Sequence, residues 1–250
     1  MEQSHCLNCN AVVTSKFCAN CGQKANTHRI TFGHFVAHDL LHGMFHLDRG
    51  IIFTLKEALT RPGKAALDYI SGKRICYYNV FYLSLVLIGV AILLYHFGTA
   101  GATMKGGDAG SEKVVELLTS NVKMIVLGFV PLLAINARLL FWKTRLNLAE
   151  HFIVAGFTFV GVLSIFDITL AVSAIANTES VFVNWVMLIL SLAALLFPFW
   201  AYGNLAWKTH SVLGLLWRMI VLYVLLFAEI IALTILAIWM ITGKTDITIH

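Results

Sequence analysis

Five long apolar runs constrain this chain more than any other feature of its sequence. They cover residues 77–97, 122–142, 150–176, 181–202 and 212–242. A helix that crosses the hydrocarbon core of a bilayer needs about 20 largely apolar residues, so each run predicts a transmembrane helix. Charged residues make up only 12% of the chain, against about 25% in soluble domains. We therefore expect a mainly α-helical, polytopic membrane protein with about five transmembrane helices.

The residues before the first apolar run have a different composition. Up to about residue 76 the chain is polar and rich in histidine and cysteine. We predict a zinc ribbon over 1–27, an amphipathic His-rich and basic interfacial segment over 28–76, and the transmembrane helical bundle over 77–250.

Four of the five cysteines form two CxxC pairs in "CLNCNAVVTSKFCANCGQK": Cys6, Cys9, Cys18 and Cys21. Four thiolates complete a tetrahedral shell, which predicts structural rather than catalytic zinc. Two disulfides are the alternative, and a reducing cytosol disfavours them. Asn10 and Gly22 suit the left-handed backbone that follows such knuckles. We expect Val12, Val13 and Phe17 to pack over the knuckles.

The distribution of basic residues predicts the orientation. They lie before the first run, between the second and third, and between the fourth and fifth: Arg61, Lys64, Lys73, Arg74, Lys143, Arg145 and Lys208. The opening "MEQSHCLNCN" has no features of a secretory signal. The positive-inside rule then places the protein in the bacterial inner membrane, with a cytoplasmic N-terminus and a C-terminus outside.

A histidine recurs at every fourth position in "HFVAHDLLHGMFHLD": His34, His38, His42 and His46. On a helix such residues share one face, where adjacent imidazoles reach a common ion. This favours a second divalent metal site, with Asp39, Asp48, Glu150 or His151 as a further ligand. An interfacial position for amphipathic imidazoles, haem ligation and a pH-sensing cluster are the alternatives.

Ionisable residues inside apolar helices usually have a function. Glu150 and His151 open the third run and are candidate catalytic residues, although Glu150 also suits a helix start. The acids Asp167 and Glu229 lie deeper, and a proton or cation role is the hypothesis for them. Arg138 and Arg218 lie near the predicted inner interface, where snorkelling to headgroups explains them.

The block "TRPGKAALDYISGKR" contains Arg61, Lys64, Lys73 and Arg74 beside glycines. These cations are candidates for binding lipid headgroups. They serve equally as orientation determinants at the inner leaflet.

Three stretches carry a resemblance to a family: "CLNCN…FCANCGQK", "ITFGHFVAHDLLHGMFHLDRGIIFTLKEALTRPGKAALDYISGKRICYYN" and "NLAEHFIVAGF". They resemble an uncharacterised bacterial membrane-protein family that joins a four-cysteine zinc ribbon to a His-bearing segment and a polytopic helical bundle. The resemblance covers about the first 85 residues and the triplet 149–151. Asn10 stands where that family usually has glycine. The resemblance implies an architecture and no activity.

Three classes of function follow from these features. The first is a membrane-anchored interaction or regulatory protein whose ribbon binds a cytosolic protein partner. The second is a membrane-embedded metal-dependent enzyme acting on a lipid-like substrate at the cytoplasmic interface. The third is a small proton- or ion-coupled transporter. The net charge of +5 is explained by membrane orientation, so membrane lipids rather than nucleic acid are the expected partners. The sequence does not predict an oligomeric state.

Overall fold

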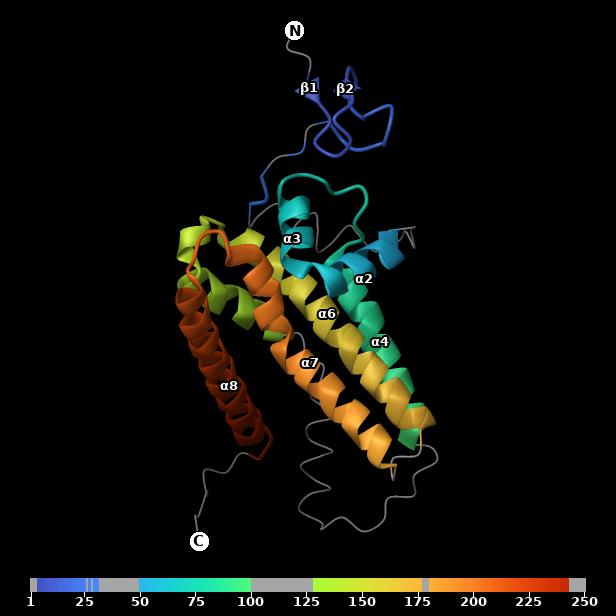
Figure 1. The fold of residues 1–250 in the computed structure, drawn as a ribbon, viewed down its shortest axis with the longest axis vertical. Helices are drawn as coiled ribbons and strands as arrows, with labels where there is room; N and C mark the ends of the chain where they lie inside the picture. Colours follow the sequence, from blue (N-terminus) through green and yellow to red (C-terminus); the bar gives the residue numbers. More distant parts are fainter. Residues whose placement is uncertain are drawn as a thin grey trace.

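The computed structural model describes residues 4–25, 27, 29–31, 50–99, 128–176 and 180–242. A small N-terminal unit lies at one end of a bundle of long helices (Figure 1). In that unit, strands β1 (Ser4–His5) and β2 (Val12–Val13) pair antiparallel, with Ser4 opposite Val13. We call residues 4–25 the ribbon.

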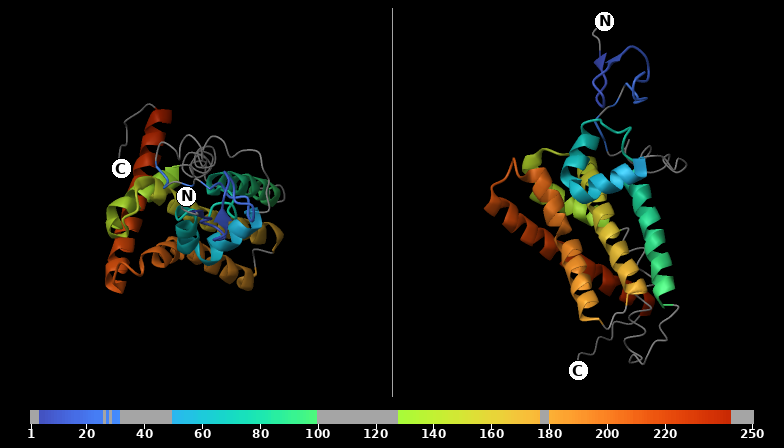
Figure 2. Two further views of the ribbon diagram at one scale, coloured as in Figure 1. Left: turned by 90° about the horizontal axis from the view of Figure 1, so that it is seen from above. Right: turned by 45° about the vertical axis from the view of Figure 1, so that its right-hand side comes forward.

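Two short helices, α2 (Gly50–Thr60) and α3 (Pro62–Ile70), lie between the ribbon and the long helices (Figures 1 and 2). Pro62 ends the first helix and begins the second, because proline lacks an N–H group and fits the first helical turn. Both helices pack against α6, and α3 also packs against α7. Gly63 permits this close packing: a Cβ there would lie 2.4 Å from the carbonyl oxygen of Ala201.

The bundle is built from long apolar helices. These are α4 (Val80–Thr99), α6 (Leu148–Ile175), α7 (Val181–Ala206) and α8 (Val212–Thr242). A shorter apolar helix covers Gly128–Leu140 and is followed by the 3-10 turn η2 (Trp142–Thr144). α6 is the central helix, since α4 and α7 both pack against it.

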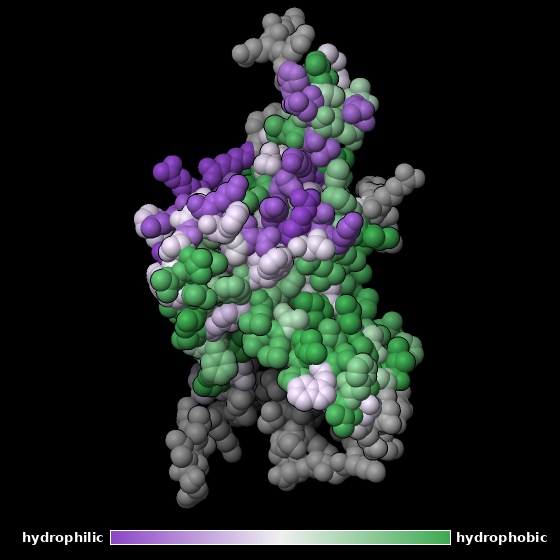
Figure 3. Space-filling view, in the orientation of Figure 1, coloured by the Kyte–Doolittle hydropathy of each residue, from purple (hydrophilic) through white to green (hydrophobic). Residues whose placement is uncertain are grey.

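Three helices, α6, α7 and α8, are long and apolar enough to cross a membrane. Their surroundings differ, because 72% of the most apolar window of α6 is buried but only 11% of that of α7 and 17% of that of α8. Figure 3 shows hydrophobic side chains over the long helices and hydrophilic ones gathered at the ribbon end. An apolar surface of this kind is compatible with a membrane protein.

The predicted spans match described helices to different extents. The third, fourth and fifth correspond to α6, α7 and α8. The first corresponds to α4, whose apolar part is Val80–Tyr95, and the second is described only over Gly128–Leu140. The total of about five spans stays a prediction, as do the three domain boundaries.

The predicted histidine stripe lies outside the described residues. This holds for His34, His38, His42 and His46, and for the candidate ligand Asp39. The second metal site therefore stays a prediction.

Candidate functional site

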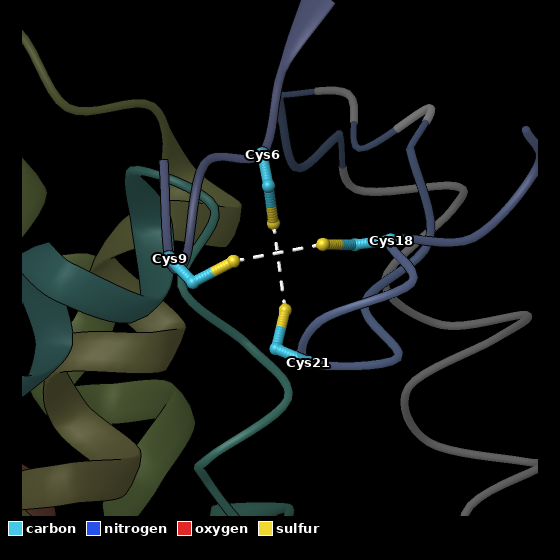
Figure 4. A group of neighbouring side chains, drawn as sticks. All are labelled: Cys6, Cys9, Cys18 and Cys21. Carbon is cyan, nitrogen blue, oxygen red and sulfur yellow. Dashed lines mark hydrogen bonds between the residues drawn. The ribbon is translucent and has the colours of Figure 1, made fainter. Parts of the chain in front are cut away.

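The four predicted cysteine ligands converge on one point in the ribbon (Figure 4). Their sulfur atoms all lie within 4.8 Å of one another. The Cys6–Cys21 and Cys9–Cys18 sulfur distances are both 3.5 Å. Bonds of about 2.3 Å to a tetrahedral zinc ion would place the sulfurs about 3.8 Å apart. The cluster can therefore hold a metal ion, and the thiolate set fits zinc.

The two halves of the cluster are built in the same way. The amide of Cys6 donates to the carbonyl of Ala11, and that of Cys18 donates to the carbonyl of Gln23. Asn10 and Gly22 close the two knuckles with φ angles of 60° and 77°. This confirms the left-handed conformation predicted for both residues, which asparagine and glycine adopt more readily than other residues.

Backbone amides prepare the first knuckle for metal binding. Hydrogen bonds from the amides of Cys9 and Asn8 lower the pKa of Cys6. A bond from the amide of Ala11, together with the side chain of Asn20, lowers the pKa of Cys9 to about 6. A thiolate is the form of cysteine that binds metal, so both effects favour an ion in this position.

All five cysteines are free, and the fifth, Cys76, is exposed and lies outside the cluster. The expected packing over the knuckles is correct only for Val13, which is 8% exposed. Val12 and Phe17 are 46% and 57% exposed. The expectation was wrong for these two because the cysteine sulfurs, Val13 and the adjoining backbone already form the small core.

The ribbon is attached to the polar end of the bundle through Gln23, which is 4% exposed. Its Nε2 donates to the carbonyl of Gly72 at 2.6 Å, and its Oε1 accepts from the amides of Arg74 and Ile75 at 3.2 and 3.4 Å. Leu7 packs over Gly72, where a Cβ would lie 2.6 Å from its Cδ1. The ribbon is therefore docked on the loop that joins α3 to α4.

A second attachment joins the segment after the ribbon to the start of α6. Arg29 forms a bidentate ion pair with Glu150, at 2.6 Å from Nε and 2.8 Å from Nη2. The Glu150 pairing raises the pKa of Arg29 further. Asn147 donates from Nδ2 to the carbonyl of the buried Ile30 at 2.8 Å. Residues 29 and 30 thus fix the position of the chain that leaves the ribbon.

Glu150 also belongs to the N-terminal cap of α6. Asn147 accepts a hydrogen bond from the Glu150 amide at 2.9 Å, and Glu150 Oε2 accepts from the Asn147 amide at 2.8 Å. This reciprocal capping box and the Arg29 pair use both carboxylate oxygens. A structural role accounts for every contact that Glu150 makes among the described residues.

His151, the other candidate catalytic residue, is fully buried in α6. Neither ring nitrogen has a hydrogen-bond partner within the described ranges. Buried imidazoles normally find such a partner, so the side chain is available to a further group. The predicted catalytic roles of Glu150 and His151 stay predictions.

The basic block after α2 forms a charge network with two acids. Arg61 pairs with the buried Glu57 and lies 3.7 Å from Asp68, which also accepts a bond from Lys73 at 2.8 Å. These ion pairs raise the pKa of Arg61. Arg74 lies over the Tyr69 ring, 5.6 Å from its centroid, and Lys64 is exposed. Headgroup binding by Arg61, Lys64, Lys73 and Arg74 stays a prediction, and the network already explains two of them.

The two intramembrane acids have different surroundings. Glu229 on α8 accepts a hydrogen bond of 2.8 Å from Asn136, on the Gly128–Leu140 helix. Asp167 on α6 is 8% exposed, and neither carboxylate oxygen has a partner among the residues that the structure describes.

Sequence reasoning missed Gln23, Arg29 and Asn147 as residues that attach the ribbon. The spacing Asn147-x-x-Glu150 ahead of an apolar run is a capping-box signal and makes that part readable. Gln23 and Arg29 carry no such signal, because their partners lie 49 and 121 positions away along the chain.

Comparison with known proteins gives one match. A family described as "Protein of unknown function (DUF3667)" matches residues 48–88. The similarity therefore covers α2, α3, the docking loop and the start of α4, and it supports a relationship to an uncharacterised family. Neither the curated proteins nor the solved structures contain a match.

Proposed function

We propose that this protein is a membrane-anchored interaction or regulatory protein whose ribbon binds structural zinc and a cytosolic protein partner. The observation that carries the proposal is that the ribbon is fixed to the bundle on one side while large apolar side chains stay exposed. Gln23 holds the attached side, and Phe17 is 57% exposed. A rigidly held module with an exposed aromatic residue is suited to binding another protein.

Zinc is the metal that the ligand set favours. Four thiolates are typical of structural zinc sites and leave no open position for a substrate. The metal would stabilise a unit whose core among the described residues contains only cysteine, alanine and valine side chains. Its proposed role is to hold the binding surface in shape.

The charge distribution supports a cytoplasmic ribbon and five spans. Every described Lys and Arg lies in the ribbon, in α2 or α3, in their connecting loops, or within about two turns of the ribbon end of a long helix. Figure 3 shows the corresponding hydrophilic end. Under the positive-inside rule this end faces the cytoplasm of the inner membrane.

The proposed partner surface consists of Lys16, Phe17 and Lys24. A backbone bridge pairs Phe17 with Lys24, so these residues are neighbours, and all three are exposed. Residues 4–25 contain no acidic side chain. A partner segment with an apolar anchor and flanking acids would complement this surface.

In-cell photo-crosslinking of the full chain tests this proposal. A photoreactive residue at Phe17 is expected to give an adduct of one defined mass, and K16E/K24E is expected to reduce it. A photoreactive residue at Lys64, exposed on α3, serves as the matched control. Absence of an adduct at Phe17, equal adducts at both positions, or insensitivity to the charge reversal would contradict the proposal.

Proton-coupled transport is a second candidate, favoured by the buried and unpartnered carboxyl of Asp167 among the described residues. It predicts that D167N abolishes proton flux into proteoliposomes, whereas D68N, at the ribbon end, leaves the flux unchanged. Equal flux in wild type and D167N would exclude it.

A further inference from the structure

We propose that the phosphate-bearing headgroup of an anionic membrane lipid binds where η2 and the α7–α8 turn meet. The site is named here the α8 corner and is defined by Lys143, Arg145, Lys208 and Arg218. It is separate from the basic block after α2 and from the surface proposed for the ribbon's partner. The inference does not depend on that partner.

Three elements meet at this corner. Arg218, in the second turn of α8, donates from Nε to the carbonyl of Leu140 at 2.9 Å. Phe141 stacks on Tyr202 of α7, with ring centroids 5.0 Å apart, and meets the edge of His210 at 5.7 Å. Figure 1 shows the start of α8 beside the segment that follows Gly128–Leu140. The cations of the two loops are therefore brought to one place by direct contacts.

The corner has a strong excess of positive charge. Residues 137–147 and 207–218 contain five cations and no Asp or Glu: Arg138, Lys143, Arg145, Lys208 and Arg218. Within the described part of the chain, the ion pairs involve Arg29, Arg61 and Lys73 instead. The nearest acid along the chain, Glu150, is already paired with Arg29. The corner cations thus await an external anion.

Tryptophans place these cations at the level of lipid headgroups. Trp142, Trp207 and Trp217 are 60%, 69% and 49% exposed, and each directly precedes a cation. Trp side chains concentrate at membrane–water interfaces because the ring is apolar and its N–H is polar. The cations beside them therefore lie where phosphates lie.

Arg218 is held in a fixed position for such a ligand. Its Nη1 donates to the carbonyl of Gly214 at 2.7 Å, and its guanidinium lies over the Trp217 ring, 4.4 Å from the centroid. Guanidinium has five N–H donors, and two are used by these carbonyl bonds among the described residues. The remaining donors suit a phosphate, which arginine binds in a bidentate manner.

The basic block after α2 is less suited to the same ligand. There Arg61 and Lys73 share the acids Glu57 and Asp68. An approaching phosphate would meet carboxylates as well as cations at that position. The balance of charge favours the α8 corner.

Native mass spectrometry of the full chain in neutral detergent tests the proposal, with phosphatidylglycerol and phosphatidylcholine as the added lipids. We expect preferential binding of phosphatidylglycerol. K143Q/K208Q is expected to weaken this binding about 25-fold, because each cation near anionic lipid contributes roughly fivefold. K56Q/K64Q removes the same charge from exposed positions on α2 and α3 and is the matched control.

The outcomes separate the alternatives. Equal affinity for the two lipids, or equal weakening by the two double variants, would overturn the proposal. Inorganic phosphate added without lipid is the further arm, and binding that is lost in K143Q/K208Q would mean a soluble phosphate site rather than a lipid site. Neither lysine of K143Q/K208Q makes a hydrogen bond to the backbone of another helix among the described residues, so folding is not at stake.

Discussion

Arg29 and Glu150 form a bidentate ion pair between the segment that follows the ribbon and the first turn of α6. Its two sides differ in exposure, with 63% of the Arg29 side chain accessible against 2% of that of Glu150. The buried carboxylate is thus neutralised by a residue that belongs to the ribbon's own connection. Correct placement of the ribbon and a stable start of α6 depend on each other.

This coupling predicts the behaviour of Asn147, which caps α6 and also binds Ile30. N147A is expected to lower the free energy of unfolding by about 1–2 kcal/mol, because a capping side chain is lost. N147S keeps a capping hydroxyl but loses the bond to Ile30, so a smaller loss is expected. Chemical denaturation in detergent micelles measures both, and equal losses would show that the cap contributes nothing.

The contact between α3 and α7 predicts opposite results for two glycines. A Cβ at Gly63 would lie 2.4 Å from the Ala201 carbonyl oxygen and 2.7 Å from the Leu205 amide nitrogen, whereas one at Gly89 meets nothing within 4 Å. G63A is expected to cost about 1–3 kcal/mol through overpacking. G89A should leave stability unchanged or slightly raise it, since alanine is the better helix former. A G63A protein as stable as G89A would disprove the close packing of these helices.

Metal content distinguishes the cysteines. Purified wild-type protein is expected to hold about one zinc ion in the ribbon. C18S should lose it, and C76S should keep it, because Cys76 lies outside the cluster. Elemental analysis gives the count. The same measurement tests the histidine stripe: a second ion that disappears in H38A/H42A would support that site, and an unchanged count would end the hypothesis.

His210 predicts a dependence of stability on pH. Burial, followed by the positive charges of Arg218 and Lys143, lowers its pKa below the ordinary 6.5. The unfolded chain therefore takes up a proton at a higher pH than the folded one does. The stability contributed by neutral His210 is present above pH 6.5 and is lost as the pH falls below it.

Melting temperatures at pH 7.5 and pH 5 check this expectation. The wild type should lose more stability on acidification than H210N, which cannot titrate at this position. An identical loss in both proteins would show that His210 is protonated equally in the folded and unfolded states.

The long helices were predictable because hydropathy is a local property. The predicted run 212–242 coincides with α8, and the runs 150–176 and 181–202 differ from α6 and α7 by at most four residues at an end. The shift at the start of α6 comes from Asn147, whose side chain caps the helix before its apolar part begins. α4 begins three residues after the predicted start, because Asn79 precedes it and accepts a bond from the amide of Phe81.

The candidate metal ligands were equally predictable, since two CxxC pairs bring their sulfurs together through short local turns. The packing around them was not, because it depends on which side of the ribbon meets the bundle. Val13 is buried, but Phe17 is exposed.

By itself, the sequence determined the apolar helices, the cysteine cluster and the basic excess at one end of the chain's helices. Each depends on neighbours within a few turns. Only the tertiary structure decided that Gln23 binds the loop at Gly72, that Arg29 neutralises Glu150, and that Arg218 meets Leu140. These pairings join positions 49 to 121 residues apart. No local pattern specifies such partners, because the packing of α3, α6, α7 and α8 brings them within hydrogen-bond distance.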